Sequence, residues 1–156
     1  PLLEDVLREF FGKILLNIEI KSRHTGDALV WLLRRHFITC ADDWDLVLIS
    51  SFKARELMRV RRRSKRANLA LLHHQNPFAF IAYHRYLKLT AVGFHRLYLH
   101  RLALEVARRA GIFIYAYTVD RPSAIHRLEH QGVQAIVTNY PDKCIAYINT
   151  HAEMHD

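Results

Sequence analysis

Cysteine, glycine and proline are scarce in this chain, and long apolar runs are missing. The 156 residues include two cysteines, five glycines and four prolines. Two cysteines are too few for a disulfide-built scaffold and suit a reducing compartment, and so little glycine and proline excludes a fibrous or linker-like chain. The longest apolar run, residues 112–119, is much shorter than the roughly 18 residues of a membrane-spanning helix. We therefore predict a cytoplasmic protein without a membrane span.

Acidic residues are in the minority. The chain has 15 Asp and Glu and 23 Lys and Arg, which gives a net charge of +8 at pH 7 with neutral histidines. A content of 51% hydrophobic and 24% charged residues is typical of a folded globular protein and excludes wholesale disorder. The length predicts one domain, over residues 1–156. The chain begins at Pro1, without an initiator methionine or a signal-peptide pattern.

Apolar runs alternate with helical patterns along almost the whole chain. Strands are predicted at residues 14–21, 45–51, 69–72, 87–92, 112–119 and 133–138. Helices are predicted at residues 2–10, 28–36, 52–62, 99–110 and 122–130 and from residue 143, while residues 76–86 are ambiguous. The alternation implies an α/β fold with a parallel sheet, because parallel strands need crossover connections. The pattern alone leaves both an open doubly wound sheet and a barrel possible.

The strand at residues 14–21 carries the first candidate site. Alternation places Asn17, Glu19 and Lys21 on one face. A carboxylate and an ammonium near the carboxyl end of a parallel strand lie where α/β enzymes bind ligands. Glutamate offers oxygen ligands to Mg²⁺ or Ca²⁺, and lysine offers a point charge to phosphate. The alternative is a solvent-exposed strand face with an incidental ion pair, and the pattern alone favours it.

Two later strands end in hydroxyl and aromatic residues. Residues 50–52 and the segment from Tyr117 to Asp120 occupy strand-end positions at which side chains line pockets. The alternative is that Phe52 and Tyr117 pack under the helices that follow them. For Asp120 we favour a cap on the helix that opens near Pro122.

The eleven histidines suggest a metal or acid–base site only weakly. We expect them to be scattered, without a helical pair or a cysteine–histidine cluster at zinc-binding spacing. Each is predicted to be a surface or half-buried residue. His74 alone is singled out, because it lies at a predicted strand end.

A dense basic run occupies residues 59–66. Such a run indicates either a nucleic-acid or anionic-membrane surface or a solvated helix end whose arginines complement the helix dipole. No stacking aromatic residues are interleaved with it. We favour the solvated helix end and predict no nucleic-acid partner.

Five segments in order share the pattern of a known family. Residues 1–7 (PLLEDVL), 16–21 (LNIEIK), 47–52 (VLISSF), 111–120 (GIFIYAYTVD) and 132–141 (GVQAIVTNYP) resemble motifs of the glycerophosphodiester phosphodiesterase family. The third matches the family's Ser-Phe strand. The fourth resembles its Trp-Thr-Val-Asn strand, and the fifth its closing Gly-Val-Asp-Gly-Ile-x-Thr-Asp-x-Pro. The chain departs from the family in having Tyr117 where Trp is common and Asn139 where Asp is common.

The resemblance implies a TIM barrel that hydrolyses glycerophosphodiesters to glycerol 3-phosphate and an alcohol, with a divalent cation and general acid–base catalysis. It implies that Glu19 is a ligand of that cation, Mg²⁺ or Ca²⁺, and that Lys21 contacts the phosphate. Phe52 and Tyr117 would form part of the apolar wall beside the glycerol. The small-molecule diester is the expected partner.

The resemblance also shows what residues 1–156 lack. The family's first strand carries a His-Arg pair, its second a Glu-x-Asp pair, and an inserted segment a second His, and none has a counterpart here. We therefore predict no catalytic residue in this chain. The predicted fold is an incomplete TIM-type barrel of about six of eight βα units, without the first two strands and roughly 90 residues short of a full barrel.

We accordingly expect a fragment that is inactive by itself. The alternatives are a non-catalytic barrel remnant that binds a phosphate-bearing ligand or a partner, and a nucleic-acid-binding module driven by the basic run.

Overall fold

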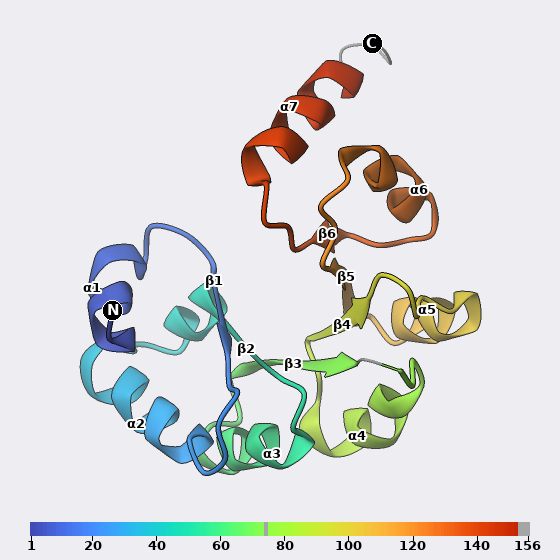
Figure 1. Cartoon of the computed structure of the whole chain (residues 1–156). Coiled ribbons are helices and arrows are strands. Elements are labelled where there is room, and N and C mark those ends of the chain that lie inside the picture. The colour runs from blue at the N-terminus through green and yellow to red at the C-terminus, as the bar shows by residue number, and fades with distance from the viewer. Residues whose placement is uncertain (74, 153–156) are drawn as a thin grey trace. The chain divides into compact units, whose positions relative to one another are not determined.

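The computed structural model describes residues 1–73 and 75–152, the last two by their backbone only. Six strands alternate with helices along this part of the chain (Figure 1). The strands are β1 (Leu16–Glu19), β2 (Val47–Ser51), β3 (Asn68–His73), β4 (Ala91–His95), β5 (Phe113–Tyr117) and β6 (Ala135–Ile136). The α-helices are α1 (Leu3–Phe10), α2 (Gly26–His36), α3 (Ala54–Arg63), α4 (Ala79–Leu87), α5 (Arg101–Arg109), α6 (Ile125–His130) and α7 (Pro141–Ala152). Two 3₁₀ segments, η1 (Asp42–Leu46) and η2 (Pro122–Ala124), precede β2 and α6.

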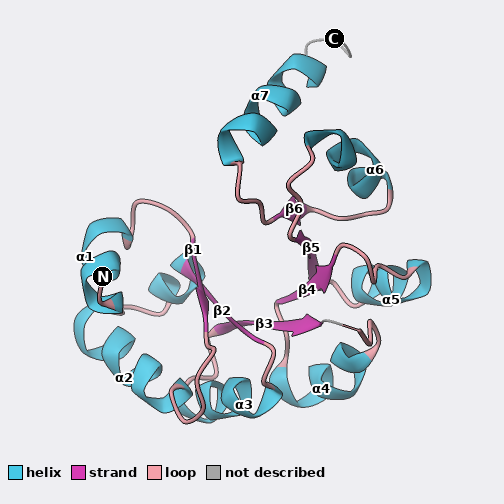
Figure 2. Ribbon diagram, viewed as in Figure 1, coloured by secondary structure: helices cyan, strands magenta, loops and turns pink. Residues whose placement is uncertain are grey.

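The strands form one sheet in chain order, from β1 to β6 (Figure 2). β1 pairs in parallel with β2, β2 with β3, and β5 with β6. A doubly wound sheet reverses its strand order partway along the chain, whereas consecutive parallel βα units in unbroken order are those of a TIM barrel. The predicted fold class, an incomplete TIM-type barrel with six βα units, is confirmed.

The chain divides into two compact units. The first comprises Pro1–Leu72 with Ala79–Ala91, and the second comprises His73–Phe78 and the chain from Val92 onward. In the first unit α2 and α3 lie side by side, and α3 contacts β2 (Figure 1). Leu33, Leu57 and Val60 of these helices are fully buried with Ile49 of β2, because their spacing puts them on the helix faces that meet the sheet.

The second unit has its own core. Phe94 of β4 and Ile114 of β5 are buried with Ala103 and Ala107 of α5. The two alanines let α5 approach β5 closely, and α5 contacts that strand directly. Tyr117 is the last residue of β5 in this unit.

The ambiguous segment of the sequence is helix α4, and the strand expected at residues 87–92 begins later. Leu87 ends α4, Lys88 adopts a left-handed backbone with φ of 46°, and β4 starts at Ala91. The apolar run misled the prediction because Leu87 and Leu89 are both buried although neither is in a strand. Similarly, the first two residues of the strand expected at 45–51 belong to η1.

Glu56 on α3 fixes the segment that connects β1 to α2. Its buried carboxylate, 3% exposed, accepts hydrogen bonds from the backbone N–H groups of His24 (2.9 Å), Thr25 (3.1 Å) and Gly26 (3.0 Å). Burial alone would raise the pKa of Glu56, but these three donors and the Arg59 guanidinium outweigh it and lower the pKa below its ordinary value. Glu56 therefore caps α2 from a neighbouring helix.

Replacing Glu56 with Ala is expected to lower the free energy of unfolding by about 3 kcal/mol, because it leaves the three backbone N–H groups of residues 24–26 without their acceptor. Glu56→Gln, which keeps one acceptor oxygen, should cost less. The measurement is urea unfolding of each variant. Glu4→Ala, which removes an exposed i,i+4 pair with Arg8, is the matched control and should change stability by less than about 0.5 kcal/mol. A loss no larger for Glu56→Ala than for the control would contradict this role.

Candidate active site

The carboxyl end of β1 presents a carboxylate and an ammonium side by side. Ile18 and Ile20 face the interior more than their neighbours do, and Glu19 lies on the opposite, more exposed face. The Lys21 Nζ is 3.8 Å from the Glu19 Oε2, with side chains 79% and 32% exposed. Glu19 and Lys21 thus form an exposed ion pair, which agrees with the shared face and also with the alternative of an incidental ion pair.

Three hydrogen bonds tie the end of β2 to the end of β1, and a fourth lies within the segment that follows β2. The Ile20 N–H donates to the Ser50 carbonyl at 2.8 Å, and the Ser51 hydroxyl donates to the Ile20 carbonyl at 2.7 Å. Ser51 Oγ also accepts from the Lys53 N–H at 3.0 Å, and Lys53 Nζ donates to the Lys21 carbonyl. Phe52, 36% exposed, is therefore held in the loop that is fastened to Lys21.

Ser50 adds a buried hydroxyl to this end of the sheet. It pairs in register with Glu19, so both side chains point to the same face. Ser50 is fully buried, and its Oγ makes no hydrogen bond to any residue that the structure describes. A buried hydroxyl of this kind is usually satisfied by a ligand or by water, which suggests that this face meets one or the other.

These residues alone do not complete a site for Mg²⁺ or Ca²⁺. Such ions take six or more oxygen ligands, commonly from several carboxylates and carbonyls. Within residues 1–73 and 75–152, no group of three or more Asp, Glu, His or Cys side chains converges on one point. Glu19 offers one carboxylate, and further ligands would have to come from elsewhere.

Tyr117, at the end of β5 in the second unit, reaches across the sheet. Its hydroxyl donates to the His73 carbonyl at 2.5 Å, so the ring spans from β5 past β4 to the end of β3. The His95 ring meets it edge-on, with centroids 5.9 Å apart. Burial lowers the pKa of His73 to about 4, so this histidine is neutral near pH 7. Tyr117 thus contacts the last residues of β3 and β4 from the end of β5, and its place beside a substrate stays a prediction.

A cavity of about 350 Å³ opens beside His95 in the same unit. Three arginines line it, Arg96, Arg121 and Arg127, together with Thr118 and other residues that follow β4 and β5. None of the three arginines forms an ion pair closer than 4 Å with any described carboxylate. The lining also includes the carboxylate of Asp120, so three arginines face one acidic residue and the cavity is electropositive on balance.

Asp120 does not cap the helix that follows it, and that prediction is wrong. The residue before η2 is Arg121, and it makes no side-chain cap. Asp120 instead accepts hydrogen bonds from the Asn139 N–H (2.8 Å), the Asn139 Nδ2 (3.0 Å) and the Thr138 hydroxyl (3.2 Å). The Asn139 donors are the main cause of its lowered pKa. The ends of the paired strands β5 and β6 bring these residues together, and this long-range contact replaces the local cap.

This contact explains the departure at position 139. The motifs that the sequence resembles have Asn at the position of Asp120 and Asp at the position of Asn139. Relative to those motifs the carboxylate and the amide have exchanged positions, and in this chain they form a hydrogen-bonded pair.

The exchange predicts mutual rescue. Asn139→Asp places two carboxylates at the present 3.0 Å contact, and Asp120→Asn places two amides there, so each is expected to lower the thermal unfolding midpoint. The double exchange, with Asp at 139 and Asn at 120, should recover most of the loss. Thermal unfolding of all four proteins measures this. Additive losses in the double variant would show that the two side chains do not act as a pair.

The histidines were misjudged. His126 and His130 lie four residues apart on α6, with their Nε2 atoms 2.9 Å from each other. The expectation that no helical histidine pair exists is therefore wrong, although the spacing was visible in the sequence. His74, the one histidine singled out, lies outside the described residues.

The basic run is only partly a solvated helix end. Arg59 and Arg63 both bind Asp27 of α2, at 3.2 Å and 2.6 Å. Arg61 donates to the Leu87 carbonyl at 2.8 Å at the end of α4. These arginines fasten α3 to its neighbours, a role the sequence did not indicate, while Arg62 is exposed as expected. The absence of a nucleic-acid partner stays a prediction.

No helix among the described residues has the length and apolarity to cross a membrane.

The unbroken succession of parallel βα units, with polar side chains at the carboxyl ends of the strands, places the chain in the class of TIM-barrel proteins.

Sequence comparison then identifies the family. The profile of the Glycerophosphoryl diester phosphodiesterase family matches residues 1–143, and the chain belongs to this family. A glycerophosphodiester phosphodiesterase of Bacillus subtilis (strain 168) is 29% identical over 151 residues, which cover 91% of this chain and 52% of the relative. The enzyme of that name from Caldanaerobacter subterraneus subsp. tengcongensis is 27% identical over 136 residues, covering 84% and 54%. The chain thus spans about half the length of these relatives.

The structure is similar to solved ones. A phosphodiesterase of Oleispira antarctica, solved in complex with the product sn-glycerol-3-phosphate, matches with a TM-score of 0.80 at 22% identity. The match covers 96% of this chain and 61% of that one. At this identity the likeness supports the fold.

Proposed function

We propose that the protein acts as a glycerophosphodiester phosphodiesterase, which hydrolyses glycerophosphodiesters to glycerol 3-phosphate and an alcohol with a divalent cation and general acid–base catalysis. The observation that carries the proposal is the Glu19–Lys21 pair at the carboxyl end of β1, in a chain that belongs to this family. In TIM-barrel enzymes that end of the strands is where the active site lies.

We assign roles to four residues. Lys21 contacts the phosphate as a point charge. Phe52 and Tyr117 form apolar walls beside the glycerol, and Glu19 supplies one oxygen ligand to Mg²⁺ or Ca²⁺. Because residues 1–156 lack counterparts of the family's two histidines and its Glu-x-Asp pair, the acid, the base and the remaining ligands come from outside these residues. By themselves, residues 1–156 should bind the product more readily than they turn over substrate.

The electropositive cavity beside His95 supports an anionic substrate. Its three arginines and the net charge of +8 raise the local concentration of a phosphodiester anion. The unpaired Cys40 and Cys144 are consistent with a cytoplasmic location, where thiols stay reduced.

Titration of the 156-residue chain with sn-glycerol 3-phosphate, followed by amide NMR, tests the binding part of the proposal. We expect chemical-shift changes at residues 19–21 and 50–52 and around Tyr117, and none with glycerol alone. Changes elsewhere only, or equal changes with glycerol, would contradict the assignment. Turnover, rather than binding, separates an enzyme from a non-catalytic protein that binds the same ligand.

A further inference from the structure

A pair of imidazoles on α6 forms a compact nitrogen cluster. His126 and His130 occupy positions i and i+4 of the helix, which places them on one face. Their ring centroids are 4.2 Å apart, with the planes at 76°. Both side chains are exposed.

The two ring nitrogens that converge are the ones that ligate metals. The Nε2 atoms of His126 and His130 are 2.9 Å apart, and in a neutral imidazole one ring nitrogen carries a free lone pair. Without a metal, one Nε2–H donates to the other Nε2. A small cation can replace that shared proton and accept a lone pair from each ring.

Glu129 supports this arrangement from the other side of the ring. Its Oε2 is 3.9 Å from the Nδ1 of His126, which is longer than a hydrogen bond. Metal-binding histidines usually direct their second nitrogen to a carboxylate or carbonyl, which fixes the tautomer that leaves the ligating nitrogen free. Glu129 is thus suited to act as a positioning residue.

We propose that His126 and His130 form a two-imidazole chelate for a divalent transition-metal ion, Cu²⁺, Ni²⁺ or Zn²⁺, with water in the other coordination positions. Imidazole suits these ions, whereas Mg²⁺ and Ca²⁺ prefer oxygen. Two protein ligands make an exchangeable site rather than a closed structural one. The proposal involves different residues and a different class of ion from the phosphodiesterase site, and it stands independently of that function.

Metal binding here should also stabilise α6. The helix has six residues, and a bridge from position i to i+4 ties one turn of it together. An ion that binds the folded protein and not the unfolded chain raises the unfolding temperature with its concentration. Affinity should follow the general order of these metals, with Cu²⁺ the tightest.

The test uses the untagged 156-residue chain with Cu²⁺ as the probe, by calorimetry and by electron paramagnetic resonance. We expect one Cu²⁺ site whose spectrum shows two equatorial nitrogens and which excess Mg²⁺ does not displace. His126→Gln and His130→Gln should each weaken binding by about tenfold or more, and the double variant little further, because either change breaks the chelate.

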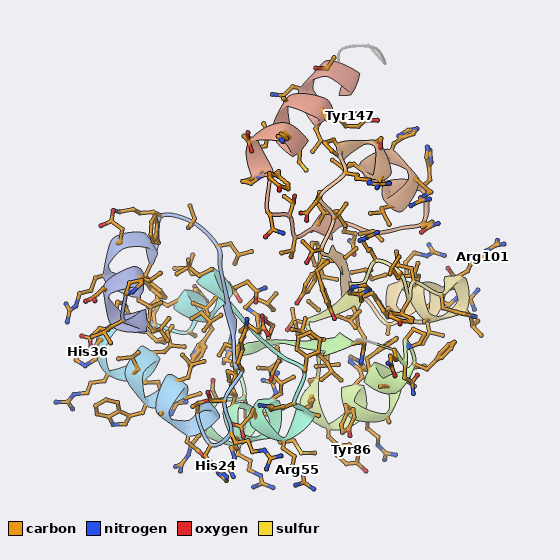
Figure 3. All side chains as sticks on the ribbon, viewed as in Figure 1. His24, His36, Arg55, Tyr86, Arg101 and Tyr147 are labelled. Carbon is orange, nitrogen blue, oxygen red and sulfur yellow. The ribbon has the colours of Figure 1, made fainter. Side chains whose placement is uncertain are left out.

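His36→Gln is the matched control. His36, at the end of α2 in the first unit, is exposed and labelled in Figure 3, and its replacement should leave the affinity unchanged. Circular dichroism of each variant establishes that the fold is retained. An affinity that is unchanged in His126→Gln, or equally reduced in His36→Gln, would overturn the proposal.

Discussion

Glu19→Gln is expected to lower kcat/KM for glycerophosphocholine by about 10³-fold or more in a joined protein. The joined protein fuses residues 1–156 to a segment that carries the family's His-Arg pair, Glu-x-Asp pair and second histidine. Glutamine has almost the shape of glutamate, so the change removes charge and leaves packing intact. The amide is a poor ligand for a hard divalent cation, and such ions contribute several kcal/mol to phosphoryl-group chemistry. Dependence on added Mg²⁺ or Ca²⁺ should weaken in parallel.

Glu9→Gln is the matched control for Glu19→Gln. Glu9, on α1, forms an ion pair of the same length, 3.8 Å, with Lys13 in the turn after the helix. Its loss should leave kcat/KM within about twofold, because exposed ion pairs contribute little to stability. A Glu19→Gln variant that keeps more than about a tenth of the activity would show that this carboxylate is not a ligand.

Lys21→Ala is expected to lower kcat/KM by about 10²-fold in the same joined protein. The lysine is a positive contact beside the phosphate, and one charge-assisted contact made in the transition state is worth roughly 2 to 4 kcal/mol. Because Lys21 is 79% exposed, its replacement should change the free energy of unfolding by less than about 0.5 kcal/mol. Steady-state kinetics and urea unfolding of the same samples separate the two effects.

Lys13→Ala, in the turn after α1, serves as the control for Lys21→Ala and should leave the kinetics unchanged. Lys21→Arg keeps the charge but not its compact shape, and an intermediate loss is expected. Equal activity of Lys21→Ala and the unaltered protein would remove Lys21 from the site.

The spacing of apolar residues along the sequence predicted the strands correctly where the local pattern and the burial in the fold point to the same structure. Buried strands such as β2 read as apolar runs, and the alternation in β1 placed Glu19 and Lys21 on one face. The same rule failed at Leu87–Leu89, where buried leucines end a helix and enter a turn. Burial is a tertiary property, and an apolar run does not reveal which backbone conformation buries it.

The long-range polar contacts around the site could not be predicted from the local sequence. Glu56 caps a helix that begins 30 residues earlier in the chain, and Asp120 binds Asn139 across a strand pair. Local rules assign such side chains to their own helix or turn, because a cap is the shortest contact available to them. Only the fold shows that a backbone group far away in the sequence lies nearer to these side chains than their own helix or turn does. His126 and His130 are the exception, since their spacing alone predicts the pair.

Release of sn-glycerol 3-phosphate from glycerophosphocholine, measured with and without a chelator of divalent cations, tests the central claim most directly. The joined protein is predicted to release it in a cation-dependent reaction, and the 156-residue chain is predicted to release none above background, because a single carboxylate and lysine supply neither the acid nor the base. Cation-dependent release by the 156-residue chain alone, well above background, would contradict the account.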